Sequence, residues 1–265
     1  MLSEMPIRGL DAEDADSGRV PTNLRMLLIL ETLALADKPL TPTEINKSIG
    51  LPKQSIHRLC QTLMDEGFLV RDMEGKRLKP AQRLMTIARG LFSSRHLNVA
   101  RRQVLLAISE ATGETVNFAV PEAEGMTYLD RVETDWIFRI ELPIGSRVPF
   151  YCTASGKCYL ASLSNAELER VFKTLRLTAR TENTLTTREA LVTELNQVRE
   201  QGYAIDNEEL FSGMIALAVP VTDRNGRYFA SVAFHGPTQR LNHEKLLEHI
   251  STMRESAKKL SSVSV

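Results

Sequence analysis

The sequence predicts an α+β protein in two parts, and three observations lead to this fold class. At 265 residues, the chain exceeds a single average domain. Residues 41–80 carry signals for two short helices and a hairpin, in that order. From Glu114 onward, strand-like segments alternate with helices that begin at capping residues. We therefore expect a small helical domain followed by a larger domain in which helices pack around an antiparallel sheet.

Two helices are predicted between Thr41 and Glu66. Thr41 is a hydroxyl N-cap, Pro42 occupies the first helical position, and Glu44 lies three residues after the cap, which together form a capping box. Gly50 and Pro52 end this helix and start the next one. The second helix, at about 52–66, has an apolar stripe at i, i+3, i+4 and i+7 spacing that consists of Ile56, Leu59, Cys60 and Leu63.

A hairpin follows the second helix. Gly67 ends the helix, Phe68 to Val70 has strand composition, residues 72–76 form a turn, and residues 77–79 form the return strand. This order is typical of a winged helix-turn-helix, which places one helix in the DNA major groove and a β-ribbon beside it. Donor-rich side chains suited to base edges and phosphates give the expected DNA contacts: Thr43, Lys53, Gln54, Ser55, His57, Arg58, Gln61, Lys76 and Arg77. The alternative is a helical hairpin whose polar face meets only water.

Local charge supports double-stranded DNA as a partner. The whole chain has zero net charge, whereas residues 53–83 contain seven basic and four acidic residues, a net charge of +3. This excess is modest. It suits a dimer or tetramer that sums several weak modules better than a tight monomeric binder.

Composition argues against several other classes of protein. No apolar run approaches the roughly 20 residues that span a bilayer, and the acidic N-terminus is unlike a signal peptide, so we expect a cytoplasmic protein with no membrane partner. Three scattered cysteines do not suggest a disulfide scaffold or a zinc site, and no cofactor is expected. Residues 1–18 are acidic and poor in apolar residues, so we expect a disordered arm.

The remaining elements complete the predicted layout. Residues 21–37 form a leucine-rich, largely buried helix, and residues 19–80 form the DNA-binding domain. A linker helix at 81–94 belongs to a linker region at 81–96, with its joint at Arg95 and His96, before a helix at 97–111. In the C-terminal domain, 97–265, strands are expected at 115–120, 126–132, 136–141, 204–206, 214–221 and 228–235. Helices are expected at 155–163, 165–175, 186–201 and 242–261, with capping boxes at 164–167 and 186–189.

The segment from Gly145 to Lys157 is the second informative stretch. Its small residues lead directly into the helix that begins near Ser155. Free N–H groups at a helix N-terminus, together with the helix dipole, favour a small anion such as a carboxylate. The alternative is a plain N-cap with a tight packing contact.

Four motifs in this order resemble the IclR family of bacterial transcriptional regulators. They are Gly50 to Leu59 (GLPKQSIHRL), Thr153 to Lys157 (TASGK), Gly202 to Glu209 (GYAIDNEE) and Ile215 to Val221. The resemblance runs from about Val20 to the C-terminus. It implies a winged helix-turn-helix, a linker helix, a C-terminal domain that binds a small-molecule effector, and dimers that often pair into tetramers.

The resemblance also implies an effector pocket. Carried over residue by residue, this pocket comprises Ile137, Ile140, Val148, Ala154, Ser155, Gly156, Asp206, Met214, Ala216, Ala233 and His235. One departure stands out, because Ala216, Ala233 and His235 occupy strand positions where small hydroxyl or thiol residues are expected. The effector of better-known members is therefore not carried over, and His235 could equally be a satisfied core histidine.

We expect a ligand-responsive transcriptional regulator, and a repressor rather than an activator. Its effector would be an organic acid or a related metabolite. One alternative is a hydrolase built on Ser155, Lys157, Asp206 and His235, although the chain has no Gly-x-Ser-x-Gly elbow. Another is a DNA-binding protein without an effector. A redox sensor based on Cys152 or Cys158 is a further hypothesis.

Overall fold

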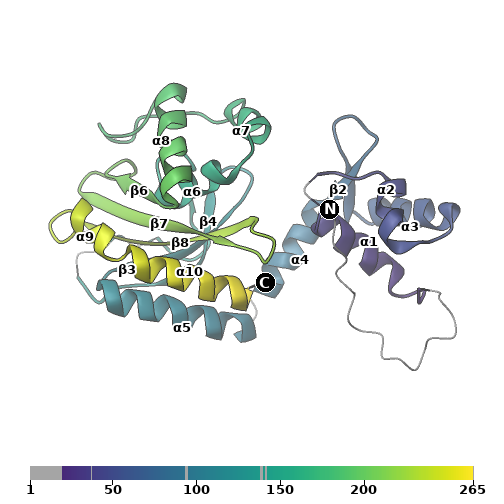
Figure 1. Cartoon of the computed structure of the whole chain (residues 1–265), viewed down its shortest axis with the longest axis horizontal. Coiled ribbons are helices and arrows are strands. Elements are labelled where there is room, and N and C mark those ends of the chain that lie inside the picture. The colour runs from purple at the N-terminus through teal and green to yellow at the C-terminus, as the bar shows by residue number, and fades with distance from the viewer. Residues whose placement is uncertain (1–19, 37, 93–94, 138–139, 141, 265) are drawn as a thin grey trace. The chain divides into compact units, whose positions relative to one another are not determined.

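The computed structural model describes residues 20–36, 38–92, 95–137, 140 and 142–264 (Figure 1). The chain forms two compact units, Met1–Leu91 and Phe92–Val265. The expected disordered arm at 1–18 lies outside the described residues. Within the described parts, no helix is both long and apolar enough to cross a membrane.

In the described residues up to Pro80, the N-terminal unit contains three helices and a two-stranded hairpin. The helices are α1 (Arg25–Ala34), α2 (Pro42–Ile49) and α3 (Lys53–Asp65), and the strands are β1 (Leu69–Arg71) and β2 (Leu78–Pro80). The apolar stripe of α3 is buried as predicted, packed against Ile29 and Leu33 of α1 and Ile45 of α2. This is the winged helix-turn-helix expected from the sequence.

The first helix is shorter and less buried than predicted. Residues 21–24 form a turn, in which the Leu24 amide donates to the Pro21 carbonyl, so α1 begins only at Arg25. Ile29 and Leu33 are buried, whereas Leu27 and Leu35 are more than half exposed. The leucine-rich pattern therefore supplies one buried stripe and one apolar stripe that remains on the surface.

The predicted capping box of α2 is confirmed, and it also ties the hairpin to the helix. The Glu44 amide donates to Thr41 Oγ1 at 3.2 Å, and the Thr41 amide donates to Glu44 Oε2 at 2.8 Å. The same Glu44 carboxylate accepts Arg77 Nη1 at 2.9 Å, from the start of the returning strand. These bonds hold the pKa of Glu44 near 2, with the Thr41 backbone N–H as the largest cause.

The two helices after the hairpin are α4 (Gln82–Phe92) and α5 (Arg95–Thr112). The predicted joint at Arg95 and His96 is wrong, because both residues belong to α5. Residues 93 and 94, between the helices, lie outside the described residues.

A six-stranded antiparallel sheet is the centre of the C-terminal unit (Figure 1), with strand order β5-β4-β3-β8-β7-β6. The strands are β3 (Thr115–Pro121), β4 (Met126–Val132), β5 (Arg147–Val148), β6 (Ala204–Asn207), β7 (Met214–Thr222) and β8 (Tyr228–Pro237). The long central strands follow the sequence prediction closely. Hydrophobic side chains lie on both faces, so both faces of the sheet are covered.

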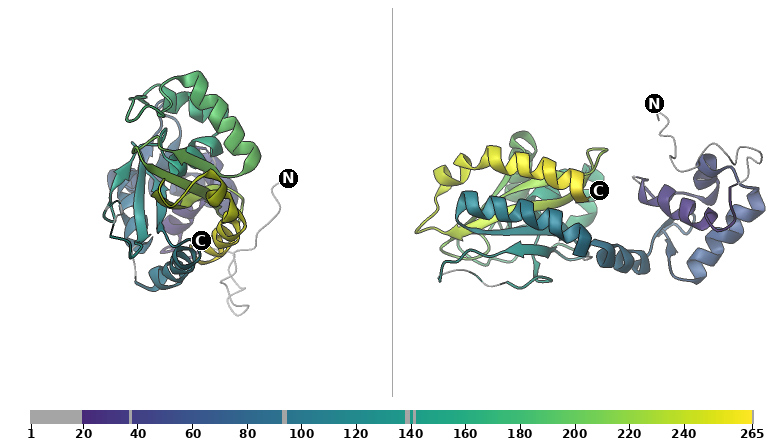
Figure 2. Two further views of the ribbon diagram at one scale, coloured as in Figure 1. Left: turned by 90° about the vertical axis from the view of Figure 1, so that its left-hand side faces the viewer. Right: turned by 90° about the horizontal axis from the view of Figure 1, so that it is seen from below.

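Helices cover the two faces in separate groups. On one face, α5 and α10 (Ile250–Ser264) lie side by side (Figures 1 and 2) and cover a core that includes Phe118, Leu217 and Phe234. On the other face, α6 (Ala154–Ser162) packs on β7 and β8, and α8 (Arg188–Gln201) packs on α6. The short α7 (Asn165–Phe172) follows α6, and its predicted capping box from Ser164 to Glu167 is confirmed.

Three predicted elements differ in the structure. Trp136, Ile137 and Ile140 are not in a strand, and residues 138, 139 and 141 of the predicted 136–141 strand lie outside the described residues. The N-cap of α8 is Thr187, which accepts the Ala190 amide, so the capping box predicted at 186–189 is wrong. The final helix is divided into α9 (His243–Glu248) and α10 at His249. In each case, the sequence pattern was compatible with more than one local structure: a strand or a loop, either of two adjacent threonine caps, and one helix or two.

Gly156 allows α6 to approach the preceding chain very closely. A Cβ at this position would lie 2.3 Å from the Phe150 carbonyl oxygen and 2.4 Å from the Phe150 Cα. Both are backbone atoms, which cannot move aside as a flexible side chain can. Only a hydrogen atom at residue 156 lets the first turn of α6 lie this close to the Phe150 backbone.

Replacing Gly156 by alanine should destabilise the C-terminal unit. Overpacking of this kind costs about 1–3 kcal/mol, and the contact with fixed backbone atoms places this site at or above the upper end of that range. Urea unfolding of the full chain measures the change. Ser162→Ala, at the exposed end of the same helix, is the matched control and should stay within about 0.5 kcal/mol of the unsubstituted chain. Equal stability of both variants would contradict the close contact.

Candidate functional site

A small cavity lies on the α6 side of the sheet. It is bounded by strand side chains, by the start of α6, and by the segment that leads into β7. Its free space is about 40 Å³, enough for a few water-sized groups. A larger ligand therefore requires lining side chains to move. The lining residues are Asn117, Tyr128, Ile140, Leu142, Thr153, Ala154, Ser155, Asp206, Leu210, Phe211, Met214, Ile215, Ala216, Ala233 and His235.

Strand alternation brings the polar lining residues together. Asn117 pairs with Ala233 across β3 and β8, and Ala216 pairs with both His235 and Asp206 across β7. All of these residues face α6, because successive side chains of a strand point to opposite faces. A register shift in the β3–β4 ladder lets Tyr128 and Arg131, three residues apart, lie on this same face.

The first turn of α6 is capped by a side chain. Thr153 Oγ1 accepts the Gly156 amide at 3.1 Å and donates to the Pro149 carbonyl at 2.7 Å. The Gly156 N–H is therefore not available to a ligand. Ala154 and Ser155, the first two residues of the helix, line the cavity instead. The sequence allowed either a plain N-cap or an anion site at this helix start. The structure contains the N-cap, and Ala154 and Ser155 also line the cavity.

His235 is only partly satisfied. Its Nδ1 lies 3.0 Å from the Asn117 side-chain nitrogen, whereas its Nε2 is enclosed and has no hydrogen-bond partner among the described residues. Asn117 is held in turn by Arg131, whose Nη1 donates to Asn117 Oδ1 at 2.8 Å. Burial, followed by the positive charge of Arg131, lowers the pKa of His235 to about 3. The imidazole is thus neutral at physiological pH, and it is not a fully satisfied core histidine.

Asp206 is the acidic group of the cavity. Its Oδ1 accepts the Glu209 amide at 2.7 Å and the Leu210 amide at 3.3 Å, so the carboxyl group shapes the turn that carries Leu210 and Phe211 to the cavity wall. Burial, followed by the negative charge of Glu209, raises the pKa of Asp206 to about 7. A ligand beside Asp206 would therefore meet a carboxyl group that can be either neutral or charged near neutral pH.

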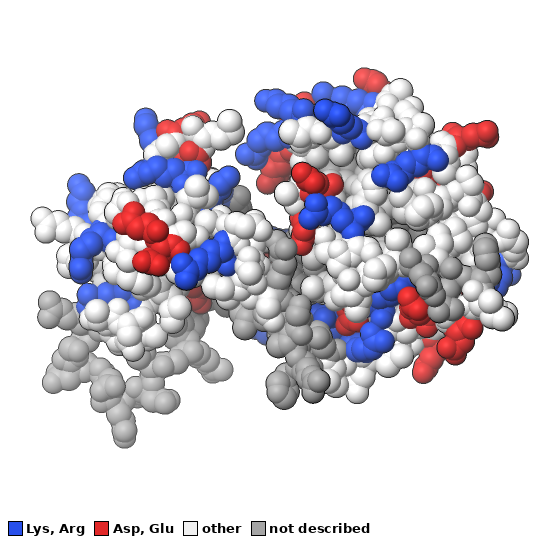
Figure 3. All heavy atoms as spheres, turned by 180° about the vertical axis from the view of Figure 1, so that it is seen from behind, with Lys and Arg blue, Asp and Glu red and all other residues white. Residues whose placement is uncertain are grey.

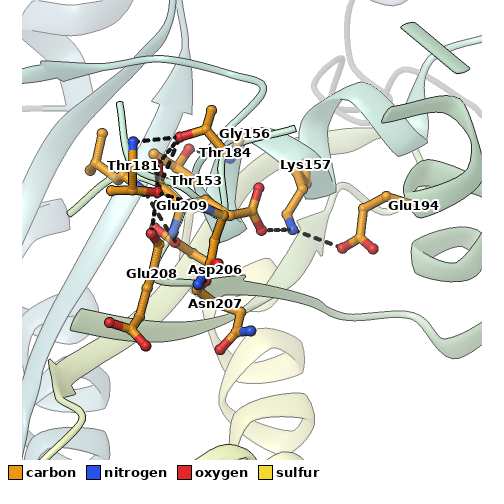
Figure 4. Close-up of polar contacts among 12 residues, drawn as sticks. Thr153, Gly156, Lys157, Thr181, Thr184, Glu194, Asp206, Asn207, Glu208 and Glu209 are labelled. Carbon is orange, nitrogen blue, oxygen red and sulfur yellow. Dashed lines mark hydrogen bonds and ion pairs between the residues drawn. The ribbon is translucent and has the colours of Figure 1, made fainter. Parts of the chain in front are cut away.

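A buried charge network lies next to Asp206 (Figure 4). Lys157, on α6, donates to Glu209 Oε1 at 2.5 Å and to Glu194 Oε1 on α8 at 2.7 Å. Burial opposes the charge of Lys157, but the two carboxylates outweigh it and raise the pKa of the ammonium group. Removing one partner from such a pair costs about 3–5 kcal/mol, because it leaves a buried charge uncompensated. Lys157 therefore joins α6, α8 and the turn after β6 and has no free hydrogen-bonding role in the cavity.

Eight of the predicted effector residues meet at the cavity: Ile140, Ala154, Ser155, Asp206, Met214, Ala216, Ala233 and His235. Ile137 is 98% exposed, Val148 is buried in the core, and Gly156 packs against Phe150. These three lie outside the cavity lining. As an effector site, the set remains a prediction.

Sequence reasoning missed several lining residues. Asn117 and Tyr128 lie on strands whose alternation was visible in the sequence. The sequence did not show that β3, which carries Asn117, pairs with both the Tyr128 strand β4 and the His235 strand β8. Thr153 was quoted only as part of a motif, although a threonine directly before a predicted helix is a recognisable N-cap signal. Leu142, Leu210 and Phe211 lie in loops and carry no periodic signal, and Ile215 lies on β7 between two predicted pocket residues.

The predicted DNA-binding side chains are mostly exposed. On α3, Lys53, Gln54, His57, Arg58 and Gln61 are exposed on the side away from the buried stripe, and Ser55 is half-buried. Thr43 and Lys76 are also exposed. Arg77 differs, because it donates to the Pro39 carbonyl and pairs with Glu44, so it helps to hold the hairpin. On the face shown in Figure 3, basic and acidic side chains are interspersed and do not form one large basic patch.

The structure gives little support to the redox hypothesis. Cys152 and Cys158 are buried, and burial raises the pKa of each thiol to about 12. A thiol of this kind carries almost no thiolate, the reactive form, at neutral pH. No group of three or more histidine, cysteine or carboxylate side chains suited to a metal ion occurs in the described part of the chain.

Asp206→Asn should change the pH dependence of stability. The folded-state pKa of about 7 exceeds the ordinary 3.8, so the folded chain holds a proton that the unfolded chain loses. The contribution of Asp206 to stability is therefore present below about pH 4 and lost as the pH rises through about 7. Asparagine keeps the acceptor oxygen and removes the titration. Urea unfolding of the full chain should show the variant gaining stability relative to the unsubstituted chain between pH 4 and 8.

Asp223→Asn is the control with the opposite sign. Burial opposes its charge, but hydrogen bonds from Arg227 outweigh this effect and lower the pKa of Asp223 below 3.8. Its stabilising contribution is present above about pH 4 and lost on acidification. A parallel pH response of the two asparagine variants would contradict the assignment of Asp206.

Comparisons with known proteins cover nearly the whole chain. The model of the IclR helix-turn-helix domain matches residues 24–73, and that of the bacterial transcriptional regulator IclR C-terminal domain matches residues 90–262. The probable transcriptional regulator SauR of Cupriavidus necator is 36% identical over 234 residues, which is 88% of this chain and 93% of that protein. The transcriptional repressor IclR of Escherichia coli is 28% identical over 247 residues, covering 92% of this chain and 90% of that protein.

A solved structure has a similar fold over most of the chain. The crystal structure of the Thermotoga maritima IclR protein is 28% identical and has a TM-score of 0.62, over 92% of this chain and 99% of that one. The helix-turn-helix is the part that binds DNA, and the larger domain is the part that binds the effector. The chain therefore belongs to the IclR family of transcriptional regulators, and it is a regulator rather than an enzyme.

Proposed function

We propose that this chain is a repressor whose operator binding is controlled by a small organic acid in the cavity beside α6. The observation that carries the proposal is the cavity itself. Its wall contains a carboxyl group, the start of a helix and His235 Nε2, which has no hydrogen-bond partner among the described residues. A few convergent polar groups in a largely apolar cavity are typical of a ligand site. The family relative named as a repressor supports the direction of control.

In the proposed complex with DNA, α3 enters the major groove. Lys53 and Arg58 would contact phosphates or bases, and Gln54, Ser55, His57 and Gln61 would read base edges. Lys76 would approach the backbone from the hairpin, and Thr43 from the start of α2. Arg77 would act through the fold, because its guanidinium is already engaged by Glu44 and Pro39.

The proposed effector is small and bears a carboxylate or a related acceptor group. The start of α6 at Ala154 and Ser155 favours negative charge through the helix dipole. The free space of about 40 Å³ favours a compound of few heavy atoms, unless Phe211 or Leu142 moves. Ile140, Met214, Ala216 and Ala233 would form the apolar wall. Val148 and Gly156 would support this site from outside it, whereas Ile137 remains on the surface.

We propose a homodimer as the DNA-binding form, with further pairing into a homotetramer. The surface stripe of α1, which consists of Leu24, Leu27 and Leu35, supports an apolar contact with a second copy. The modest net charge of +3 across residues 53–83 also supports it, since paired modules reach useful affinity from weak individual contacts.

Arg58→Ala and Lys53→Ala should each weaken operator binding. Loss of one phosphate or base contact costs about 1–3 kcal/mol, which is roughly a 5-fold to 150-fold loss of affinity. An operator selected from random DNA and a binding titration at fixed salt measure the effect. Arg224→Ala, an exposed arginine in the β7–β8 turn, is the control and should bind normally. Unchanged operator affinity in both α3 variants would refute the role of this helix.

A further inference from the structure

The structure leaves three buried side-chain polar atoms without a hydrogen-bond partner among the described residues. They are Thr127 Oγ1, Glu209 Oε2 and His235 Nε2. Of these three residues, only His235 lines the cavity. A buried polar atom without a partner costs about 1–3 kcal/mol, so a group that satisfies it contributes to binding. A ligand in the cavity can therefore contact His235, whereas Thr127 and Glu209 lie outside the cavity lining.

A chain of hydrogen bonds fixes which kind of group His235 offers. A guanidinium group has only donors, so Arg131 Nη1 donates to the oxygen of the Asn117 amide, at 2.8 Å. The nitrogen of that amide then faces His235 Nδ1, at 3.0 Å. An amide NH2 can only donate, so Nδ1 must accept. The neutral ring therefore carries its proton on Nε2, which is a donor.

The chain cannot easily reverse, because Arg131 is itself held in place. Its side chain is 2% exposed, its Nε donates to Glu133 Oε1 at 3.1 Å, and its Nη2 donates to the Ile140 carbonyl. Flipping the Asn117 amide would set the NH2 group against this guanidinium, donor against donor. The three residues lie on the adjacent strands β4, β3 and β8, so the sheet ladder fixes their spacing.

We propose that Arg131 and Asn117 are positioning residues that hold His235 as a neutral hydrogen-bond donor, so that the cavity selects ligands with an acceptor atom opposite Nε2 and rejects ligands with a donor there. This inference rests on the proposed function, since it names the feature by which the effector site chooses its ligand. The low pKa of His235, about 3, agrees with a ring that stays neutral at physiological pH.

The selected ligands are small compounds in which an oxygen of a carboxylate, carbonyl or similar group meets Nε2. Rejected ligands include amines, amidines and other compounds that would place an N–H group against the Nε2 proton. Arg131 does not line the cavity, so its effect on the ligand passes through Asn117 and His235.

The first test needs no ligand. Nitrogen-15 NMR of the full chain with labelled histidine should show His235 with a protonated Nε2 and an unprotonated Nδ1. The His235 signal is assigned by its loss in His235→Leu. Asn117→Asp places an acceptor beside Nδ1 and should move a proton onto it. A ring already protonated at Nδ1 in the unsubstituted chain, or no response of Nδ1 to Asn117→Asp, would overturn the positioning role.

The second test measures selectivity with shape-matched probes. The pairs are acetate and acetamidine, propanoate and propanamidine, and benzoate and benzamidine, each titrated by calorimetry into the full chain. In at least one pair, the carboxylate should bind more tightly than the amidine. His235→Leu should weaken that carboxylate about 10-fold to 100-fold, because a hydrogen bond to a charged group is lost, and leave the amidine unchanged or tighter.

Two controls separate this effect from others. Thr127→Val removes a buried hydroxyl that lies outside the cavity and has no partner in the described part of the chain, so it should leave the affinity ratio of each pair unchanged. Neither substitution changes the charge of the protein at neutral pH, so its general preference for anions or cations stays the same. A change in the ratio of carboxylate to amidine affinity therefore reports on Nε2. If no carboxylate binds more tightly than its amidine, or if His235→Leu leaves the ratio unaltered, the selectivity is refuted. Operator binding is measured separately, so that result leaves the DNA-binding role intact.

Discussion

The seating of α6 on one face of the sheet is the constraint on which the rest of the C-terminal unit depends. Gly156 brings the first turn of the helix against the Phe150 backbone, and the Thr153 cap fixes its start. Lys157, one residue later, ties the same turn to α8 and to the turn after β6. The cavity lies between the start of α6 and strand positions that include the small residues Ala216 and Ala233.

Much of the fold was predictable from local signals. The capping box at Thr41, the buried stripe of α3 and the long central strands all follow from short-range patterns, and the structure contains them. The errors have a physical cause. Thr186 and Thr187 are both acceptable caps, and only packing of α8 decides between them. A Trp-Ile-Phe run favours a strand, but the described residues of 136–141 find no partner strand, and a strand needs one.

The cavity was predictable in part, for a different reason. The residues at the start of α6 and on β7 and β8 belong to motifs that the family resemblance identified. Asn117 and Arg131 could not be found in this way, because their importance comes from cross-strand pairing with one another and with the His235 strand. His235, which stands where a small hydroxyl or thiol residue was expected, is also the cavity residue whose Nε2 finds no partner among the residues that the structure describes. A position that breaks the expected pattern was therefore the most useful guide to what is particular to this chain.

The two units divide the work between reading DNA and sensing a ligand. In the N-terminal unit, the side chains expected to touch DNA are exposed, and the neighbouring Glu44–Arg77 pair fixes the hairpin. In the C-terminal unit, Asp206 connects the cavity wall to Glu209 and hence to Lys157 and α8 (Figure 4). A ligand that changes the hydrogen bonding of Asp206 would thus act on charges that join two helices to the sheet, which is a physical route from occupancy to a change in the unit.

The proposed function requires that occupancy of this cavity controls operator binding. The most direct measurement is the operator affinity of the full chain as a function of the concentration of a small carboxylate that binds it, compared with Ala233→Leu, whose larger side chain would fill the cavity. We predict that the carboxylate changes the operator affinity of the unsubstituted chain several-fold and has no effect on the filled variant, which still binds DNA. An equal response of the two proteins to the carboxylate would contradict the account.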